Sequence, residues 1–265
     1  MTVVAQISDL HVRPEGELYQ GLVDSNAMFA RAIETLNDVR PVPDLVIVSG
    51  DLTDEGTPAE YAMLKSLLAT LTHPYIVLPG NHDDRDALRD AFAGHTWLPR
   101  SGPLHFACDV GAIRLIALDT SVPGDHHGEL GVDQLAWLDR ELAACRDRRA
   151  MIAMHHPPFD TGIPYLDLYG LRQPEALADV IAAHPHVDRI VAGHVHRSMQ
   201  TRLGNTPVIT CPSTTTQIAL RVDADASPAS YMEPPAFMLH RWADGKPAVS
   251  HLSYIGRFDG PLPFA

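Results

Sequence analysis

Short runs of apolar and β-branched residues recur along the chain, and they restrict its fold more than any other feature. Six of them lie in the first three quarters, at residues 3–7, 45–48, 75–78, 113–118, 151–154 and 190–192. Each run predicts a buried strand. Because helical patterns lie between several of these runs, the sequence predicts an α/β fold.

One helix start is marked clearly. Thr57-Pro58-Ala59-Glu60 supplies an N-cap residue, a proline at the first helical position and a glutamate at the third, which together form a capping box. Apolar residues then recur at helical spacing as far as Leu71. Three further helices are predicted at residues 24–40, 132–145 and 174–184.

The last quarter follows a different pattern. Residues 207–211, 236–242 and 248–254 predict strands without helices between them, and residues 223–235 predict a loop or linker bounded by prolines. We therefore expect a catalytic domain over residues 1–214. Residues 215–265 would complete a sheet and supply a loop that serves as a cap or a dimerisation segment.

The composition suits a globular protein and disfavours a polyanionic substrate. The 265 residues are 45% apolar, which allows one large domain with a sizeable core. The formal net charge of −13 would repel a polyanion, so we expect no long nucleic acid as a substrate. No apolar run approaches the roughly 20 residues of a membrane helix, and we expect no membrane association.

The N-terminal residues and the cysteines indicate the cellular compartment of the protein. The first residues carry no basic segment and no long apolar stretch, so we expect no signal peptide. Cys108, Cys145 and Cys211 are odd in number and far apart, which favours free thiols in a reducing cytoplasm.

Metal-ligating residue types follow five of the predicted strands. The segments are Ser8-Asp9-Leu10-His11, Ser49-Gly50-Asp51, Pro79-Gly80-Asn81-His82-Asp83, His155-His156-Pro157-Pro158 and Gly193-His194-Val195-His196. Sites in α/β sheets form at the carboxyl ends of strands, so these segments can converge. Each alone is equally consistent with a turn or a capped loop. Five of them in order, each after a strand, predict one shared site.

The residue types suit a centre of two metal ions. Two divalent cations about 3.5–4 Å apart need an anionic bridge, and the carboxylate of Asp51 can supply one. Imidazoles and an amide oxygen favour Fe, Zn, Mn or Co over calcium. Water bound to such ions becomes a hydroxide nucleophile near neutral pH, which suits hydrolysis of a phosphate ester.

These five segments resemble the signature blocks of calcineurin-like metallophosphoesterases, most closely those of bacterial glycerophosphodiesterases and class III cyclic-nucleotide phosphodiesterases. The likeness covers the chain from Val3 to about His251. It implies a four-layer αββα sandwich of two mixed sheets flanked by helices. It also implies catalytic roles for His82 and Asp51, and substrate binding by Asn81 and His82.

The resemblance further implies how the metal ligands divide. Asp9, His11 and His196 would hold one metal, and Asn81, His155 and His194 the other. Asp51 would be shared, and His82 would contact the phosphate. Because His82 stands next to Asn81, we further expect it to protonate the leaving alkoxide, with Asp83 as an orienting partner.

The sequence does not decide the roles of several residues near the ligand segments. His156 is an alternative ligand to His155, although the resemblance favours His155. Arg13, Tyr19 and Arg197 lie beside the ligand segments and could equally touch the substrate or not. The cluster Asp125-His126-His127 favours a solvated loop over a substrate contact.

The expected activity is hydrolysis of small phosphodiesters of the glycerophosphodiester type. The alternatives are a 3′,5′-cyclic-nucleotide phosphodiesterase, a phosphomonoesterase and a non-catalytic scaffold, and the complete ligand set disfavours the scaffold. Large side chains such as Tyr231 and Met232 in the predicted loop suggest a contact surface, so we expect at least a dimer.

Overall fold

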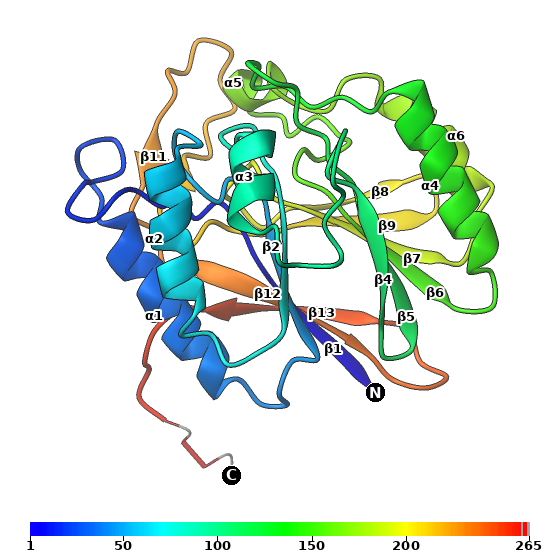
Figure 1. The fold of residues 1–265 in the computed structure, drawn as a ribbon, viewed down its shortest axis with the longest axis horizontal. Coiled ribbons are helices and arrows are strands. Elements are labelled where there is room, and N and C mark those ends of the chain that lie inside the picture. The colour runs from blue at the N-terminus through cyan, green and yellow to red at the C-terminus, as the bar shows by residue number, and fades with distance from the viewer. Residues whose placement is uncertain (261, 264–265) are drawn as a thin grey trace.

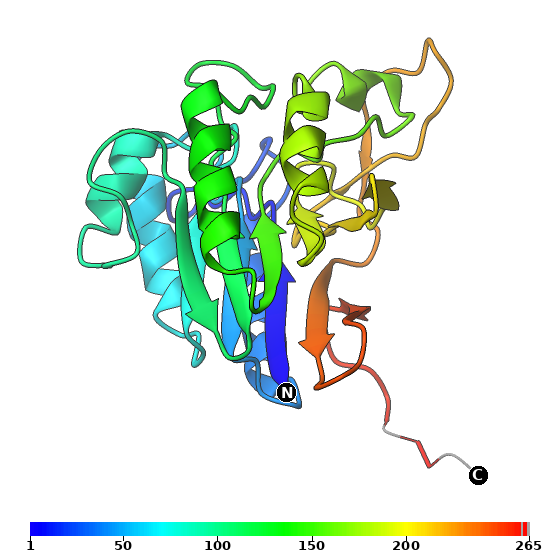
Figure 2. The same ribbon diagram turned by 90° about the vertical axis from the view of Figure 1, so that its right-hand side faces the viewer.

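Two large β-sheets face each other in the computed structural model, and helices cover their outer sides (Figures 1 and 2). The structure describes residues 1–260 and 262–263. Residues 261, 264 and 265 of the predicted C-terminal segment lie outside the described residues. The arrangement confirms the predicted α/β class with two mixed sheets.

The first sheet has five strands in the order β13-β12-β1-β2-β3. Parallel pairing joins β1 to β2 and β2 to β3, whereas β12 is antiparallel to both β1 and β13. The strands are β1 (Thr2–Ile7), β2 (Leu45–Ser49), β3 (Tyr75–Leu78), β12 (Ala236–Trp242) and β13 (Val249–Tyr254). The chain thus returns at its end to extend the sheet in which it began.

The second sheet has six strands in the order β4-β5-β6-β7-β9-β8. Its four central strands are parallel, and the outer two are antiparallel to their neighbours. The strands are β4 (Phe106–Val110), β5 (Ile113–Ala117), β6 (Arg149–Ala153), β7 (Val187–Ala192), β8 (Gln200–Leu203) and β9 (Thr206–Thr210).

Alternate residues of each central strand pack into different layers. Val4 and Ile47 lie in the core between the sheets, whereas Ala5, Ile7 and Val48 lie in the core under the helices. Because both faces are covered, the strands are apolar throughout, which explains the continuous apolar runs of the sequence.

The helices form the two outer layers. Residues of α1 (Ser25–Asp38), α2 (Pro58–Leu68) and α3 (Arg85–Ala91) share a core with the first sheet, and those of α4 (Val132–Ala144) and α6 (Pro174–Ala182) share one with the second. The capping box at Thr57 and Glu60 is confirmed.

Several short elements were not predicted from the sequence. These are β4, β8, α3, the single turn α5 (Pro164–Asp167) and the two-residue pair β10 (Gln217–Ile218) and β11 (Ser230–Tyr231). Of these, β11 lies inside the segment predicted as a loop, at 223–235, and pairs with β10. The missed strands β4 and β8 are largely exposed or half-buried, so they lack the continuous apolar run that marks a buried strand such as β3.

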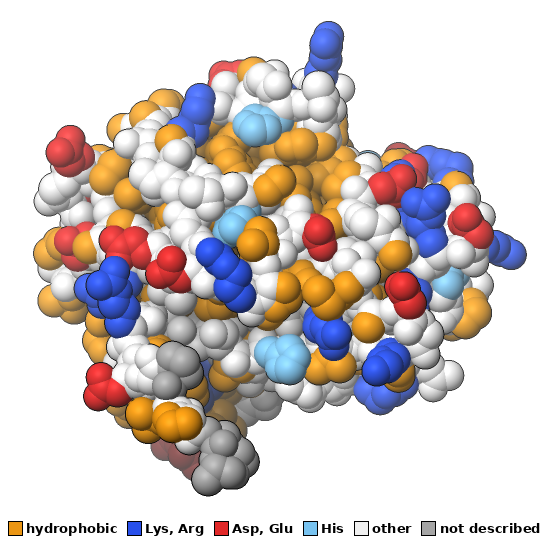
Figure 3. All heavy atoms as spheres, turned by 90° about the horizontal axis from the view of Figure 1, so that it is seen from below, with side chains coloured by type: hydrophobic (Ala, Val, Ile, Leu, Met, Phe, Trp, Pro, Cys, Tyr) orange, Lys and Arg blue, Asp and Glu red, His pale blue; other side chains and the backbone are white. Residues whose placement is uncertain are grey.

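The surface seen from below, on the side of the N-terminus, carries basic and acidic side chains interspersed with hydrophobic ones (Figure 3). Among the described residues, no helix combines the length and the apolar character that crossing a bilayer requires.

Candidate metal centre

The five ligand segments meet at the carboxyl ends of β1, β2, β3, β6 and β7, so both sheets contribute to one site. His11, after β1, and His196, after β7, approach to 3.1 Å between their Nε2 atoms. The Nε2 atom of His155, after β6, lies 3.2 Å from the Oδ1 atom of Asn81, after β3. Contacts of this kind join all eight predicted site residues: Asp9, His11, Asp51, Asn81, His82, His155, His194 and His196.

The backbone turns sharply at these residues. Positive φ values occur at Asp9 (56°), His11 (46°), Asp51 (47°), His194 (70°) and His196 (48°). Residues with side chains rarely adopt this conformation, and Asp and His tolerate it better than most. Strained backbone of this kind gathers at functional sites, where the surrounding fold imposes it.

Two glycines allow the segments to approach so closely. A Cβ atom on Gly80 would lie 2.1 Å from the Oδ1 atom of Asp51, and one on Gly50 would lie 2.2 Å from the Nδ1 atom of His155. No side chain fits at such distances. The glycines that precede Asp51 and Asn81 are therefore needed for packing against the ligands themselves.

One group of potential ligands is Asp9, His11, Asp51 and His196. The Nδ1–H group of His196 donates to the carbonyl oxygen of Thr216 at 2.8 Å, which leaves the lone pair of Nε2 free. That atom faces the Nε2 atom of His11 and, at 3.4 Å, the Oδ1 atom of Asp9. Two imidazole nitrogens and a carboxylate oxygen converge here, which is the donor set that a divalent transition metal requires.

A second group lies around Asn81. The Nδ1–H group of His155 donates to the carbonyl oxygen of Ser49 at 2.9 Å, so the Nε2 atom is the one that turns toward Asn81 and toward the Oδ1 atom of Asp51, 3.3 Å away. The Nδ1 atom of His194 lies 2.9 Å from the Oδ1 atom of Asn81, and its buried Nε2 atom has no hydrogen-bond partner. This group also fits a metal ion.

Asp51 lies between the two groups. Its Oδ1 atom is 3.3 Å from His155 Nε2, and its Oδ2 atom is 3.8 Å from His11 Nε2. One carboxylate therefore presents an oxygen to each group, as a bridging ligand must.

Burial and charge shift the pKa values in this cluster. Burial raises the pKa of Asp51, but the positive charges of His155 and His82 outweigh it and hold the pKa well below the ordinary value. Burial lowers the pKa of His155, but the charge of Asp51 and their hydrogen bond raise it to about 9. Burial and the charge of His155 lower the pKa of His194 to about 3. The buried carboxylates thus stay ionised and attract cations.

His156 is placed differently from His155. Its Nε2–H group donates to the carbonyl oxygen of His126 at 3.1 Å, and its Nδ1 atom accepts from the hydroxyl of Thr120 at 2.8 Å. Both ring nitrogens are thereby satisfied within the protein, so His156 offers no free lone pair.

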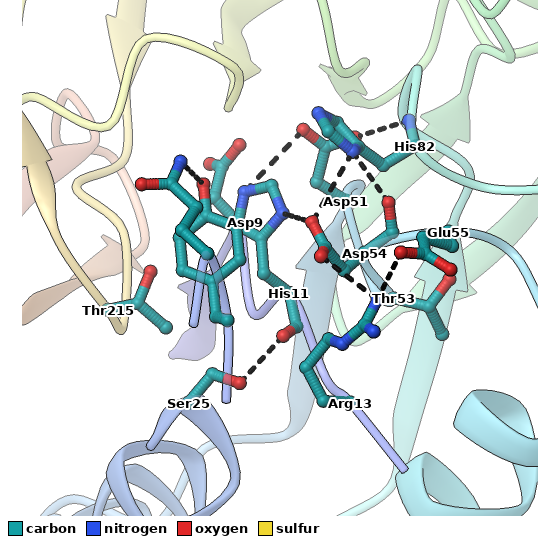
Figure 4. A network of polar contacts seen from close by, with 12 residues as sticks. Asp9, His11, Arg13, Ser25, Asp51, Thr53, Asp54, Glu55, His82 and Thr215 are labelled. Atoms are coloured by element: carbon teal, nitrogen blue, oxygen red, sulfur yellow. Dashed lines mark hydrogen bonds and ion pairs between the residues drawn. The ribbon is translucent and has the colours of Figure 1, made fainter. Parts of the chain in front are cut away.

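His82 stands at the edge of the cluster, where its ring meets that of His11 edge-on at 4.9 Å (Figure 4). Its Nδ1–H group donates to the carbonyl oxygen of Asp54 at 2.7 Å. Burial lowers the pKa of His82, but the charges of Asp51 and Asp54 and the bond to the Asp54 carbonyl raise it.

The prediction that Asp83 orients His82 is wrong. The carboxylate of Asp83 accepts from the backbone N–H of Gly80 at 2.8 Å and from the hydroxyl of Tyr61 at 2.9 Å, so it holds the loop in place. Asp54, which the sequence did not single out, orients His82 instead. Its own carboxylate also lies 3.7 Å from the Nδ1 atom of His11.

The two arginines beside the ligand segments are engaged with other groups of the protein. Arg13 pairs with carboxylates that include Asp54 at 3.1 Å and Glu60 at 3.0 Å. Arg197 donates to the carbonyl oxygen of Ile218 at 2.7 Å and pairs with Glu233 at 3.0 Å. These partners occupy both guanidinium groups.

Tyr19 and His126 do line the site. The ring of Tyr19 stacks on that of His11 at 4.5 Å. The Nδ1 atom of His126 accepts a hydrogen bond from the Nδ2 group of Asn81 at 3.1 Å, which points the Oδ1 atom of Asn81 at His155 and His194. The sequence favoured a solvated loop at His126, and no spacing pattern could have revealed this contact.

A cavity of about 490 Å³ opens above the cluster. Its floor contains site residues such as Asp51 and His82, and its outer wall is mostly aromatic and apolar. The wall residues come from α5 and from the segments around β10 and β11, and they include Tyr165, Leu166, Tyr169, Ile218, Pro228, Ala229 and Ser230.

Comparisons with known proteins show which proteins this chain resembles. The calcineurin-like phosphoesterase family matches residues 2–198. A protein of Arcobacter nitrofigilis, named "Probable glycerophosphodiester phosphodiesterase GpdQ", is 36% identical over 263 residues, which cover 99% of this chain and 96% of that protein. The cAMP/cGMP dual specificity phosphodiesterase MT0825 of Mycobacterium tuberculosis is 36% identical over 216 residues, covering 80% of this chain and 67% of the relative.

Among solved structures, a dimetal phosphatase from Danio rerio has the same fold. The TM-score is 0.70 at 16% sequence identity, and the match covers 96% of this chain and 98% of the phosphatase.

Proposed function

This chain belongs to the calcineurin-like phosphoesterase family, and we propose that it hydrolyses small phosphodiesters, glycerophosphodiesters foremost. It is a metal-dependent phosphodiesterase, since its family is one of metal-dependent phosphoesterases and its relatives are named phosphodiesterases. Glycerophosphodiesters come first because the match to the Arcobacter protein extends over nearly the whole of both chains.

We assign the metal ligands as the resemblance implies. Asp9, His11 and His196 hold one ion, and Asn81, His155 and His194 hold the other, while Asp51 contributes to both. The convergence of imidazole nitrogens and side-chain oxygens at two points, with Asp51 between them, supports this assignment. Nitrogen and oxygen donors in this mixture favour Fe, Zn, Mn or Co.

When bound, two divalent ions neutralise charge on the phosphate and supply an activated water. The protein's own residues do the remaining work. The Asp54 carbonyl fixes the Nδ1–H group of His82, so the Nε2 side of the ring faces the cavity. A proton held at that Nε2 atom can bind a phosphate oxygen and then pass to the departing alkoxide.

A cyclic-nucleotide phosphodiesterase is the second candidate. Tyr165 and Tyr169 meet edge-on at 5.5 Å in the outer wall, where a flat base could pack. The relative MT0825 is named for cAMP and cGMP. We rank this reading second because the Arcobacter protein combines 36% identity with a match over nearly the whole of both chains, whereas the match to MT0825 is shorter and a cyclic-nucleotide relative matched over 97% of this chain is 32% identical.

A substrate panel tests the function. Protein loaded with Mn²⁺, Co²⁺ or Zn²⁺ is assayed on glycerophosphoethanolamine, cyclic AMP and p-nitrophenyl phosphate. We expect the highest kcat/KM on the glycerophosphodiester, and no activity in an Asp9→Ala variant, whereas Arg31→Ala at an exposed position of α1 should match the wild type. A preference for the monoester would contradict the proposal.

We also infer that the chain forms at least a dimer through residues 215–254. Leu220, Val222, Tyr231 and Met232 are all exposed on the segment that walls the cavity. Apolar side chains gathered in this way are typical of a contact surface. Light scattering should give a dimer mass, and changing Tyr231 and Met232 to Ser should lower it. A monomer at micromolar concentration would contradict the inference.

We place the protein in the cytoplasm. Its three cysteines are all free thiols, and Cys145 and Cys211 are buried, which suits a reducing compartment. Fractionation of the producing cell should recover the enzyme with cytoplasmic markers, and recovery with an exported fraction would contradict this placement.

A further inference from the structure

Gln6 is a polar residue in the apolar strand β1, and its side chain is fully buried. It shares a face of the strand with Val4, which lies in the core between the two sheets. A buried amide is costly unless its polar atoms find partners, because both its N–H and its C=O groups lose water on burial. The partners of this amide therefore decide what it does in the fold.

The amide nitrogen of Gln6 joins the two sheets. It donates to the hydroxyl of Ser49, on β2 of the first sheet, at 2.9 Å, and to the carbonyl oxygen of Ala192, on β7 of the second sheet, at 3.0 Å. Each partner stands two residues before a proposed metal ligand, Asp51 in one case and His194 in the other. One side chain thus connects two of the strand ends from which the metal centre is built.

The orientation of this amide follows from its partners. A backbone carbonyl can only accept, so the amide atom that faces Ala192 is the nitrogen. The amide oxygen then accepts from the Nε2–H group of His240 at 3.2 Å. The Nδ1 atom of His240 accepts from the hydroxyl of Ser250 at 2.7 Å, and Arg189 donates to that hydroxyl oxygen. The amide nitrogen and oxygen are both satisfied, so the side chain is held in one position.

The two sheets approach each other closely beside this amide. A Cβ atom on Gly193, after β7, would lie 2.0 Å from the Oγ atom of Ser8, after β1, and 2.9 Å from the carbonyl oxygen of Ser49. The same carbonyl oxygen accepts from the Nδ1–H group of His155 at 2.9 Å. A change in the spacing of the sheets at this point would therefore move ligands of one sheet relative to those of the other.

Both groups of potential ligands draw on both sheets. His11 follows β1 of the first sheet, whereas its neighbour His196 follows β7 of the second. Asn81 follows β3 of the first sheet, whereas its neighbour His155 follows β6 of the second. The distance between the sheets at their carboxyl ends therefore sets the size of both groups.

Resting on the proposed function, we propose that Gln6 is a positioning residue for the metal centre. Its amide fixes the distance between the two sheets at their carboxyl ends, and thereby the distance between the ligands that each sheet supplies. Its side-chain hydrogen bonds go to Ser49, Ala192 and His240, so it acts on the ligands through the strands that carry them. Ligands have to be held within about 0.5 Å of their working positions, which requires support of this kind.

Gln6→Met tests the proposal, because methionine keeps the length of the side chain and removes all three hydrogen bonds. Calorimetric titration of the metal-free protein with Mn²⁺ measures the affinity for each ion. We expect the variant to bind both ions about 10-fold more weakly or worse, because the ligands of both are drawn from the two sheets. Loss of a partner that serves one ligand should weaken one ion only.

The electron paramagnetic resonance spectrum of the Mn²⁺-loaded protein separates positioning from stability. Two Mn²⁺ ions that share a bridging carboxylate are magnetically coupled, and the coupling depends on the geometry of the bridge. We expect the hyperfine pattern of a coupled pair in the wild type and a weakened coupling in Gln6→Met at saturating Mn²⁺. A general loss of stability would leave the coupling in the folded, loaded protein unchanged.

A control variant lies in the same core at the opposite end of the strands. Ile113, at the start of β5, is buried between the sheets, and Ile113→Ala leaves a gap there. Denaturant unfolding should show that it is destabilised, while both Mn²⁺ affinities and the spectrum match the wild type. Should Gln6→Met fold poorly, Ser49→Ala removes one of the same hydrogen bonds and should lower both affinities several-fold.

The outcomes distinguish this inference from the proposed function. Weaker binding of both ions with weaker coupling in Gln6→Met, but not in Ile113→Ala, supports the inference. Wild-type affinity and coupling in Gln6→Met, a loss confined to one ion, or an equal loss in Ile113→Ala overturns it. A wild type that binds two Mn²⁺ ions but cleaves no diester overturns the proposed function alone, and one that binds no Mn²⁺ overturns both.

Discussion

His196 and His240 are both buried histidines, and the difference between them shows what separates a candidate ligand from a core residue. The Nδ1 atom of His240 accepts from the hydroxyl of Ser250 at 2.7 Å, and its Nε2–H group donates to the Oε1 atom of Gln6 at 3.2 Å. Both ring nitrogens are satisfied. In His196 the Nδ1–H group donates to the carbonyl oxygen of Thr216. The Nε2 atom instead faces the Nε2 atom of His11 and the carboxylate of Asp9.

The two regions also differ in their charge. Burial, with a contribution from Arg189, lowers the pKa of His240 to about 3, so its imidazole stays neutral. Burial lowers the pKa of His196 as well, but the carboxylate of Asp9 outweighs it and raises the pKa. A buried histidine that faces a carboxylate and a second lone pair is arranged for a cation, whereas one with two neutral partners is arranged for packing.

The largest expected effect comes from removing the carboxylate between the two ligand groups. Asp51→Ala should lower the bound metal from two ions toward none and reduce kcat by roughly 10³-fold or more, because both sites lose a ligand. Elemental analysis and steady-state kinetics measure this. A variant that keeps two ions would show that Asp51 is not shared.

His82→Ala should preserve the metals and lower kcat on an alkyl diester about 10²- to 10⁴-fold, since the leaving alkoxide loses its proton donor. The loss should be smaller for p-nitrophenol, which leaves well without a proton. Metal content and kcat on both substrates decide this. Equal losses on the two substrates would count against a proton-transfer role.

His126→Ala tests the hydrogen bond that directs the amide of Asn81. We expect affinity for the metal held by Asn81 to fall about 10- to 100-fold, as is usual when a partner of a ligand is removed. Metal titration by calorimetry measures it, with His251→Ala as the control. Unaltered affinity would mean that Asn81 is held in place by other contacts.

The smallest expected effect is a dependence of the free energy of unfolding on pH, caused by the titration of His240. An unfolded histidine titrates near 6.5, and the folded pKa is about 3, so the unfolded state binds more protons between these values. The stability is complete above pH 6.5 and decreases as the pH falls toward 3. Between pH 7 and pH 5 the loss is about 2 kcal/mol.

Denaturant unfolding at the two pH values measures that loss. His240→Gln removes the titrating group, so its stability should fall less between pH 7 and pH 5 than that of the wild type, by about 2 kcal/mol. Other histidines with lowered pKa values, such as His194, titrate in both proteins and cancel. An identical fall in both would contradict the buried, neutral state of His240.

Much of the fold follows from local sequence. The apolar runs gave the central strands within one to three residues at each end, and Thr57 with Glu60 marked the start of α2, because strand burial and helix capping depend on neighbouring residues. Among the short elements, α3 does begin at a capping residue, Asp84, whereas the two-residue strand β11 carries no such signal. Their position depends on the loops that hold them.

The sequence by itself determined the residue types of the metal centre, because ligands must follow the strands that place them and glycines must precede Asp51 and Asn81 to make room. Only the tertiary structure decided which ring nitrogen of each histidine is free, that Asp54 rather than Asp83 orients His82, and that His126 directs Asn81. The physical reason is distance along the chain. Asn81 and His126 are 45 residues apart, and a hydrogen bond between such segments leaves no periodic trace in the sequence.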